Sequence, residues 1–118
     1  MRALGVVAAT AVILALGGGR VGLAAGDAAK GDTAFQKYCT GCHGAKGKGD
    51  GPMSAALNPK VKDLSNKTYN GSLKDDYLIK IIKNGGEAVG KSPMMPKASA
   101  LKDGEVADVI AYIRSLAK

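Results

Sequence analysis

The residues of this chain with the clearest chemistry are two cysteines and a histidine in one short run, Cys39-Thr40-Gly41-Cys42-His43. The C-x-x-C-H spacing is typical of covalent attachment of a c-type haem. Two thiols three positions apart on a helical turn can each add to one vinyl group of a haem, and the adjoining His43 then faces the iron as an axial ligand. Because the chain has no other cysteine or histidine, we expect one haem c and no second histidine ligand.

Three other uses of the same run are weaker hypotheses. A structural zinc site takes four nitrogen or sulfur ligands, and this run offers three adjacent ones. A dithiol redox motif belongs beside a βαβ pattern, whereas no strand-like segment flanks these cysteines. A surface disulfide is the third alternative, and it gives His43 no role.

The opposite face of the iron needs a second ligand, and sulfur is the natural choice in a chain with a single histidine. Of the four methionines, Met1 falls in an N-terminal leader and Met53 follows His43 closely for a residue that must reach the other side of the haem. Met94 and Met95 remain, in an extended loop bracketed by two prolines that can hold a thioether over a flat cofactor. A His/Met ligand pair would also raise the reduction potential of the haem.

The N-terminus has the pattern of a secretory signal peptide. A basic start at Arg2 precedes an apolar run over 3–16, and small residues follow, with cleavage after Ala24, Ala25 or Ala28 as the possible positions. The apolar run is short for a membrane-spanning helix, so an uncleaved membrane anchor is the alternative. Export of a haem protein behind such a leader indicates a bacterial periplasm.

The sequence therefore divides into a signal peptide, 1–25, and one small domain, 26–118. The whole chain has one Phe, four Tyr and no Trp, and a domain this small buries a thin core, so a flat apolar haem would complete it. The formal net charge is +7, and removal of Arg2 and Arg20 with the leader leaves 15 basic against 10 acidic residues, or +5. The lysines are spread along the chain, which favours an electropositive face that steers the protein toward an acidic partner. No basic helix interleaved with aromatics is present, so nucleic acid is not an expected partner.

Helical periodicity outlines the elements that must position these residues. Three stretches have it, and they are 27–38, 73–84 with Ser72 as N-cap, and 103–116 with an apolar stripe from Val106 to Leu116. The segments between them are a glycine-rich loop over 44–52, a short turn over 53–57 and an irregular stretch over 58–70. Because no strand pattern appears, we expect an all-α domain of three main helices plus loops wrapped around one covalent haem.

At this point the sequence resembles the small class I c-type cytochromes over nearly the whole domain. The resemblance is carried by Cys39–His43, Gly51-Pro52, Met95-Pro96 and the terminal helix that bears Tyr112. It implies the small cytochrome c fold and, as distal iron ligand, Met95, with Met94 as the alternative. It also implies that the carbonyl of Pro52 accepts a hydrogen bond from the ring of His43 and holds it in place.

The resemblance also implies how the first and last helices meet. Gly31 and Phe35 resemble the residues that cross the terminal helix, which implies contact near Val109 and Tyr112, with Gly31 letting the two backbones approach closely. Lys97 departs from the pattern, because many relatives carry an apolar or aromatic residue there, and this changes the polarity expected near the haem edge.

Two familiar motifs in the chain do not support the functions that they name. The segment 85–92 matches the nucleotide-binding pattern G-x-x-x-x-G-K-[ST] letter for letter, but a phosphate loop leaves a strand and opens a helix. Here a helical segment precedes the match and Pro96 would break a following helix, so we expect no nucleotide. The glycosylation patterns that begin at Asn66 and Asn70 are interpreted as turn chemistry.

These observations favour a periplasmic electron-transfer protein that cycles a haem c between Fe(III) and Fe(II), and not an enzyme. We expect a monomer that docks transiently on redox proteins with acidic faces, with Lys46, Lys48, Lys91 and Lys97 as rim charges and membrane contact only if the leader is retained. The alternative is a haem c subunit permanently bound to a periplasmic oxidoreductase complex. A catalyst or gas sensor with an open iron site is a third hypothesis, and it requires that neither Met94 nor Met95 binds the iron.

Overall fold

The computed structural model describes residues 26–118, and over that range it contains helices and no strands. The helices described there are α1 (Ala28–Tyr38), α2 (Thr40–His43), α3 (Lys67–Ser72), α4 (Asp75–Asn84) and α5 (Asp103–Ser115), with 3₁₀ turns η1 (Ser54–Ala56) and η2 (Glu87–Val89). The predicted all-α class is therefore confirmed, while the predicted signal peptide, 1–25, lies outside the described residues. None of the described helices is long and apolar enough to cross a membrane.

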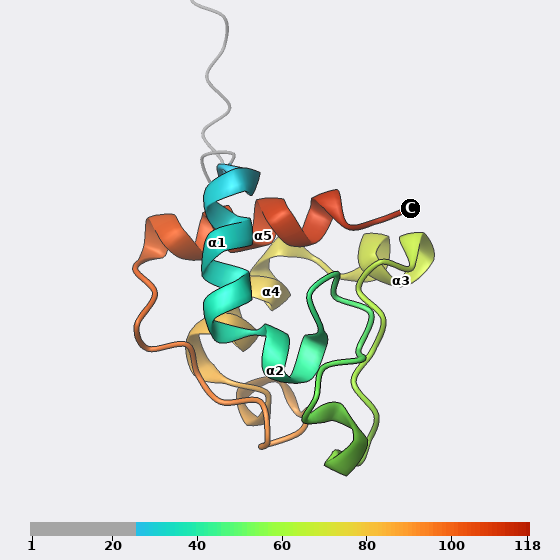
Figure 1. The fold of residues 1–118 in the computed structure, drawn as a ribbon. Helices are drawn as coiled ribbons and strands as arrows, with labels where there is room; N and C mark the ends of the chain where they lie inside the picture. Colours follow the sequence, from blue (N-terminus) through green and yellow to red (C-terminus); the bar gives the residue numbers. More distant parts are fainter. Residues whose placement is uncertain (1–25) are drawn as a thin grey trace, which may run out of the picture.

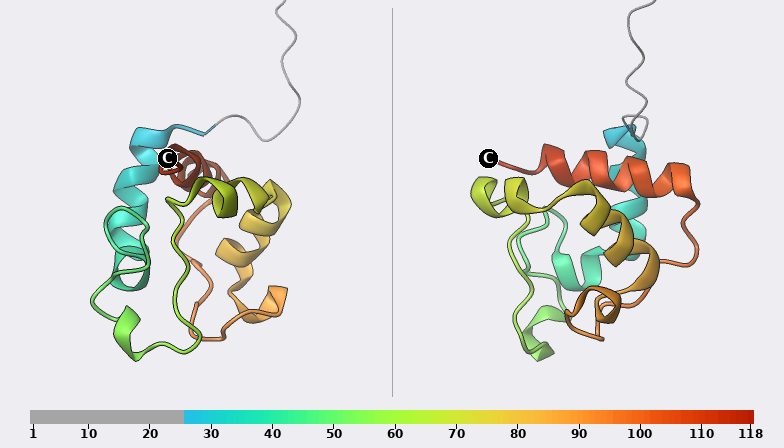
Figure 2. Two further views of the ribbon diagram at one scale, coloured as in Figure 1. Left: turned by 90° about the vertical axis from the view of Figure 1, so that its right-hand side faces the viewer. Right: turned by 180° about the vertical axis from the view of Figure 1, so that it is seen from behind.

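The domain is arranged around the crossing of its first and last helices. Figure 1 shows α1 crossing α5, with α2 directly below α1. In the left view of Figure 2, α1 and α2 lie on one side of the domain, while α4 and the orange segment that follows it lie on the other. The segments that the sequence analysis linked to the two sides of a haem are thus well separated in space.

The predicted crossing of α1 and α5 is confirmed. Gly31 lies within α1, where a Cβ atom would stand 1.8 Å from the backbone oxygen of Asp108 and 2.9 Å from the Cβ of Tyr112. The backbones therefore touch at this point, and only glycine fits. Beside it the rings of Phe35 and Tyr112 pack with centroids 5.1 Å apart and tilted by 57°, a favourable aromatic geometry.

The chain enters α1 already attached to α5. The Asp27 carboxylate caps α1 by accepting from the backbone N–H groups of Ala29 and Lys30 at 2.9 and 3.1 Å. The Asp27 backbone N–H donates to Oδ1 of Asp108 over 2.8 Å. A cut after Ala28 would remove this cap and this contact, whereas a cut after Ala24 or Ala25 would keep both.

The hydrophobic core gathers on α5. The predicted stripe from Val106 to Leu116 is buried, and it joins side chains from α1, α4 and the loops. The buried apolar side chains are Phe35, Leu64, Leu78, Ile82, Leu101, Val106, Val109, Ile110, Tyr112, Ile113 and Leu116. The aliphatic residues dominate, as expected of a small domain with few aromatic residues.

The segment around Asn70 differs from the prediction of irregular structure. It forms α3, which Asn66 caps by accepting from Tyr69 N over 2.9 Å. Ser72 is not the N-cap of the next helix but the last residue of α3, and its hydroxyl donates to the Tyr69 carbonyl. The physical reason is tertiary: Asn70 is 2% exposed, and its buried side-chain hydrogen bonds outweigh the turn preference of an Asn-Gly pair.

Candidate functional site

α2 is a single helical turn that carries the C-x-x-C-H run directly after α1. Cys39 ends α1, where its backbone N–H donates to the Phe35 carbonyl over 2.8 Å. The Cys39 carbonyl in turn accepts from His43 N over 2.9 Å. Cys39 and Cys42 therefore share one helical turn, and His43 adjoins the second of them, as attachment of a haem at two neighbouring thiols requires.

Cys39, just before α2, and Cys42, within it, are free and half-buried. Burial raises the pKa of the Cys39 thiol to about 11, and the nearby Cys42 raises it further. Cys39 is therefore a protonated thiol at neutral pH. Over residues 26–118, no three His, Cys, Asp or Glu side chains are grouped to hold a metal ion, so the geometry gives the zinc hypothesis no support.

His43 is half-buried and packs against α1. Its ring centroid lies 6.1 Å from that of Phe35, with the ring planes tilted by 47°. Burial lowers the pKa of His43, which favours the neutral imidazole, the form that binds a metal. The Nδ1 atom is buried and has no hydrogen-bond partner among the described residues.

The loop after His43 folds back onto α2. Gly49 N donates to the His43 carbonyl over 2.8 Å, and Gly51 N donates to the Cys42 carbonyl over 3.2 Å. A Cβ atom at Gly51 would stand 2.4 Å from the Gly41 oxygen, so the loop requires glycine there. These bonds hold the loop against the helical turn that carries the cysteines.

Pro52 follows this contact, but the hydrogen bond predicted for it is not formed. Pro52 is exposed, and no bond joins its carbonyl to His43, whose Nδ1 is unpartnered. In this structure the His43 ring is held by packing against Phe35. An unpaired buried polar atom costs about 1–3 kcal/mol, so Nδ1 needs a hydrogen-bond partner. The role of Pro52 as that partner stays a prediction for the haem-bound protein.

Two side chains that the sequence analysis did not assign to the site anchor the same loop. The Tyr112 hydroxyl donates to the Ala45 carbonyl over 3.0 Å. The Gln36 amide donates to that carbonyl over 2.9 Å and to Asp32 Oδ1 over 2.9 Å. Ala45 lies two residues after His43, so α1 and α5 jointly fix the loop beside the imidazole. The only sequence signal for this was the polar tip of Tyr112 on an otherwise apolar stripe.

The three methionines of the described residues occupy different environments. Met94 is 61% exposed and Met53 is 59% exposed, whereas Met95 is half-buried. Met53 Sδ lies 3.2 Å from where a Cβ on Gly41 would stand, so it packs on the outside of α2. Met95 belongs to the segment after α4, on the side of the domain away from α2 (Figure 2). Placement thus separates Met94 and Met95 from Met53, and burial distinguishes Met95 from the exposed Met94.

The residues present fit a covalently attached haem. The donor set contains two free thiols on one helical turn, an adjacent neutral imidazole and a half-buried thioether from a separate segment. Imidazole and thioether are a ligand pair that haem iron accepts. The unpartnered Nδ1 of His43 is consistent with a ring whose final orientation is set when its other nitrogen binds a metal.

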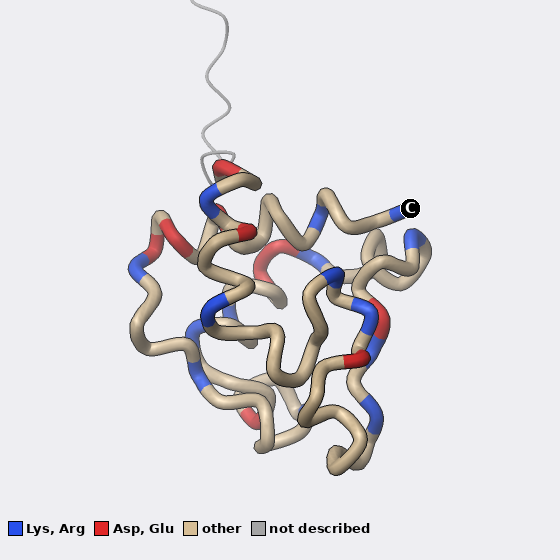
Figure 3. Tube along the Cα trace, in the orientation of Figure 1, with Lys and Arg blue, Asp and Glu red and all other residues tan. Residues whose placement is uncertain are grey.

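A lysine ridge runs along one side of the domain, and we define it as Lys46, Lys48, Lys60, Lys62, Lys67 and Lys118. Most of these lysines lie on two segments, 44–50 and 60–67, which run side by side. Leu64 N donates to the Gly47 carbonyl over 2.7 Å, and a Cβ at Gly49 would stand 2.4 Å from the Val61 oxygen. All six lysines are exposed. Figure 3 shows basic positions grouped on this side of the trace.

The lysine ridge accounts for most of the net charge of the domain. It contains two carboxylates, Asp50 and Asp63, against its six lysines, while the other nine basic residues of 26–118 face eight acidic ones. The pKa of Asp63 is lowered mainly by hydrogen bonds from Ser65 and also by Lys48. Four of the five net positive charges therefore lie on the ridge. Of the predicted rim charges, Lys46 and Lys48 belong to it, whereas Lys91 and Lys97 lie on the segment around Met95.

A family pattern and a known protein of similar sequence both match this chain over most of the described domain. The sequence pattern of the family described as Cytochrome c matches residues 28–117. The chain is 30% identical over 95 residues to cytochrome c-554(547) of Halothiobacillus neapolitanus, covering 78% of this chain and 99% of the relative.

Two solved structures are similar in fold. The c-type cytochrome KustC0563 superposes with a TM-score of 0.62 at 20% identity, covering 75% of this chain and 98% of its own. A chain of the Kuenenia stuttgartiensis reducing HAO-like protein complex Kustc0457/Kustc0458 has a TM-score of 0.59 at 27% identity, over 75% of this chain and 41% of its own.

Proposed function

Because this chain belongs to the cytochrome c family and is thus a haem c electron-transfer protein, we propose that it is a freely diffusing periplasmic carrier with a single haem. The observation that carries the haem assignment is the pairing of two free, half-buried thiols with a neutral imidazole on the helical turn 39–43. The leader-like N-terminus supports the periplasmic location. The chain contains no further cysteine or histidine, which supports one haem.

In this proposal each site residue has one task. Cys39 and Cys42 would hold the haem by thioether bonds, His43 and Met95 would bind the iron, and the Pro52 carbonyl would accept from His43 Nδ1. A haem held in this way supplies one-electron exchange between Fe(III) and Fe(II). Because the protein would then supply both iron ligands, no substrate would reach the iron, and we infer that the protein is not an enzyme.

The absorption spectrum of the purified oxidised protein, with and without cyanide, tests this ligation. A weak red charge-transfer band of Fe(III)–thioether and slow cyanide uptake are expected. A high-spin spectrum with rapid cyanide uptake would overturn the carrier and favour the open-iron hypothesis.

For the partner, we propose a redox protein with an acidic docking face that meets the lysine ridge. The support is charge complementarity, because four of five net positive charges lie there, and complementary charges accelerate encounter. The probe is reduced flavodoxin, an acidic one-electron donor, mixed with the oxidised protein at several ionic strengths. Lys46→Glu with Lys62→Glu should slow the reaction and flatten its salt dependence.

The control for this test changes the same charge elsewhere. Lys80 and Lys102 are exposed and lie outside the ridge, so Lys80→Glu with Lys102→Glu should slow the reaction less. Equal slowing by both pairs would show that only the total charge matters and would contradict a docking role for the ridge. A third pair, Lys91→Glu with Lys97→Glu, asks the same question of the segment around Met95.

The second candidate is a haem c subunit held permanently in a periplasmic oxidoreductase. It is favoured by one observation, the similarity of the domain to part of a chain from an HAO-like complex. Size-exclusion chromatography of the protein from its native cells, detected by haem absorbance, separates the two. A carrier elutes as a monomer, whereas a subunit co-elutes with a large partner.

A further inference from the structure

The segment that imitates a phosphate loop, 85–92, has a different role in the structure. It follows α4 rather than a strand, and it contains the short turn η2. We propose that Gly86 in this segment is a positioning residue that fixes the backbone of Met95 and thereby the thioether ligand of the iron. The proposal rests on the proposed function, in which Met95 binds the haem.

The backbone of Met95 is held at both ends. Its carbonyl accepts from Gly86 N over 2.9 Å, and its N–H donates to the Ser92 carbonyl over 3.2 Å. The Gly86 carbonyl accepts from Lys91 N over 2.8 Å, which closes the turn on itself. The N–H group that a phosphate loop would offer to a ligand is therefore occupied by the protein's own Met95.

Close packing makes glycine necessary at position 86. A Cβ atom there would stand 2.1 Å from the Ser92 backbone oxygen and 3.3 Å from the Cβ of Met95. The first contact is with backbone, which cannot turn aside as a flexible side chain does. Any larger residue at this position must therefore displace the segment from Ser92 to Met95.

The frame that holds this segment is the C-terminal end of α4. Ala98 N donates to the Ile82 carbonyl over 2.8 Å, and Gly85 N donates to the Ile81 carbonyl over 2.9 Å. Ile82 is 5% exposed, so α4 is itself anchored in the core. The hydrogen bonds of Gly86 and Ala98 thus attach the Met95 segment to the anchored end of α4 at two points. The side chain of the neighbouring Met94 is 61% exposed.

The expected consequence concerns the strength of the iron–sulfur bond. A ligand whose backbone is already fixed loses little further freedom on binding, whereas a ligand on a displaced loop must be ordered first. Displacing the Met95 backbone should therefore weaken the thioether relative to an exogenous ligand, without a change in the ligand atom itself.

The test is Gly86→Ala in the haem-loaded protein, read by the red charge-transfer band, the rate of cyanide uptake and the reduction potential. We expect weakening or loss of the band, cyanide uptake faster by about tenfold or more and a lower potential. Gly104→Ala is the matched control, because a Cβ at this α5 position meets nothing within 4 Å, and it should leave all three readouts unchanged.

A second control separates positioning from general destabilisation. Arg114→Ala weakens the fold at α3 and α5, away from Met95, and should lower the unfolding midpoint while it keeps the band. If Gly86→Ala keeps the band, the cyanide rate and the potential of the wild type, the proposal is overturned. If the wild type itself lacks the band, it is the proposed His/Met ligation that has failed, and the positioning role falls with it.

A measurement on the native protein decides the question if Gly86→Ala does not fold. Amide hydrogen exchange should find the Gly86 N–H protected in the haem-loaded wild type, since it donates to the Met95 carbonyl. Exchange at the rate of an unstructured peptide would overturn the proposal. In Met95→Leu, which keeps the backbone and removes the thioether, the same protection should persist.

Discussion

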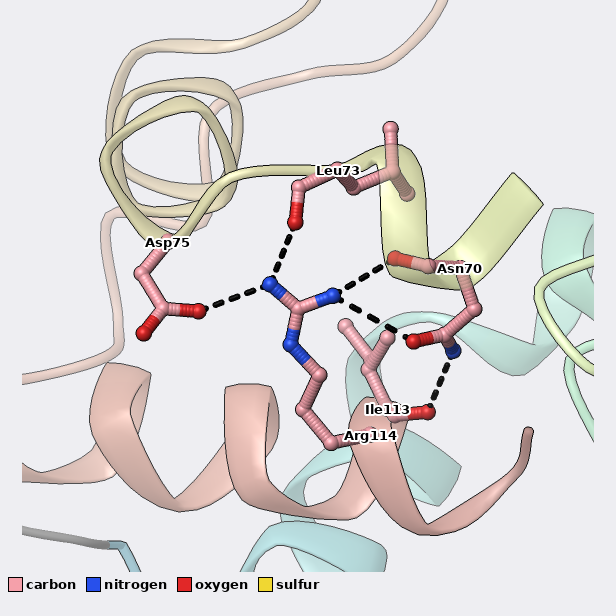
Figure 4. Close-up of polar contacts among 5 residues, drawn as sticks. All are labelled: Asn70, Leu73, Asp75, Ile113 and Arg114. Atoms are coloured by element: carbon pink, nitrogen blue, oxygen red, sulfur yellow. Dashed lines mark hydrogen bonds and ion pairs between the residues drawn. The ribbon is translucent and has the colours of Figure 1, made fainter. Parts of the chain in front are cut away.

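Arg114 of α5 binds Asn70 of α3 at two points, with Nη1 2.6 Å from the backbone carbonyl oxygen and 3.3 Å from the side-chain Oδ1 (Figure 4). The other guanidinium nitrogen donates to the Leu73 carbonyl and, over 2.7 Å, to Asp75 Oδ1. One side chain of α5 therefore ties together α3, the turn after it and the first residue of α4. Figure 4 shows these contacts converging on the guanidinium plane.

The first prediction concerns Asn70, the buried polar side chain at the centre of this network. Its amide donates to the Leu64 carbonyl over 2.7 Å and to the Ile113 carbonyl over 2.8 Å. Asn70→Ala removes both bonds and leaves the Leu64 carbonyl unpaired, while the Ile113 carbonyl keeps only its bond from Leu116 N. We expect a loss of about 2–4 kcal/mol in the free energy of unfolding. Urea denaturation followed by circular dichroism measures it.

The control for Asn70 is an exposed ion pair. Lys83 Nζ lies 2.6 Å from Asp103 Oδ1, with side chains 42% and 85% exposed. Lys83→Ala should cost less than about 1 kcal/mol, because solvent screens the pair. A loss from Asn70→Ala as small as that from Lys83→Ala would show that the buried network is not a major source of stability.

The second prediction compares two glycines in helices. Gly31→Ala places a Cβ 1.8 Å from the Asp108 oxygen, so α1 and α5 must separate. We expect a loss of several kcal/mol in the free energy of unfolding, about 3 or more. Gly104→Ala meets nothing within 4 Å and should instead stabilise α5 by up to about 1 kcal/mol. Thermal unfolding of both variants measures this, and similar midpoints would contradict the close crossing.

The third prediction assigns the iron ligand. Met95→Leu should remove the red charge-transfer band of the oxidised protein and open the iron to cyanide, because the half-buried thioether is lost. Met94→Leu should preserve both properties, since the Met94 side chain is 61% exposed. The reverse result would make Met94 the ligand. It would mean that the loop takes another conformation in the haem-bound protein, with the side chain of Met94 in the place of that of Met95.

The fourth prediction concerns alkaline pH and Tyr112. Burial, and secondarily the charge of Asp32, raise the pKa of the Tyr112 phenol. Because the folded state favours the protonated phenol, its stabilising contribution is complete below the ordinary tyrosine pKa of about 10 and is lost as the pH rises through the raised value. Wild type should therefore lose stability relative to Tyr112→Phe above about pH 10.

Near neutral pH the same variant isolates one hydrogen bond. Tyr112→Phe removes the donor at 3.0 Å from the Ala45 carbonyl but leaves the Gln36 amide, which donates over 2.9 Å. The expected cost is about 1 kcal/mol, measured by urea denaturation at pH 7. If the difference in the free energy of unfolding between wild type and Tyr112→Phe stays constant from neutral to alkaline pH, the pKa of this phenol is the same in the folded and unfolded states and the alkaline prediction is wrong.

Local patterns in the sequence were sufficient for the elements whose signals are short-range. The spacing of Cys39, Cys42 and His43 predicts one helical turn with the chemistry of haem attachment, and α2 has that form. The apolar stripe of α5 and the position of α1 were likewise predictable, because side-chain periodicity and capping act within a few residues. The family resemblance also anticipated the close approach at Gly31.

Tertiary structure decided what depends on contacts between distant segments. The pairing of Asn70 with Arg114 turns an Asn-Gly turn signal into α3, since buried hydrogen bonds outweigh local propensity. Gly86 N donates to the Met95 carbonyl, a backbone contact that no residue pattern encodes. The sequence alone could reject a phosphate loop at this segment but could not assign the segment this contact. The lysine ridge forms only because the 44–50 and 60–67 segments fold side by side. In each case the deciding interaction joins residues that are distant in the sequence and come together only in the folded chain, so local sequence patterns cannot predict it.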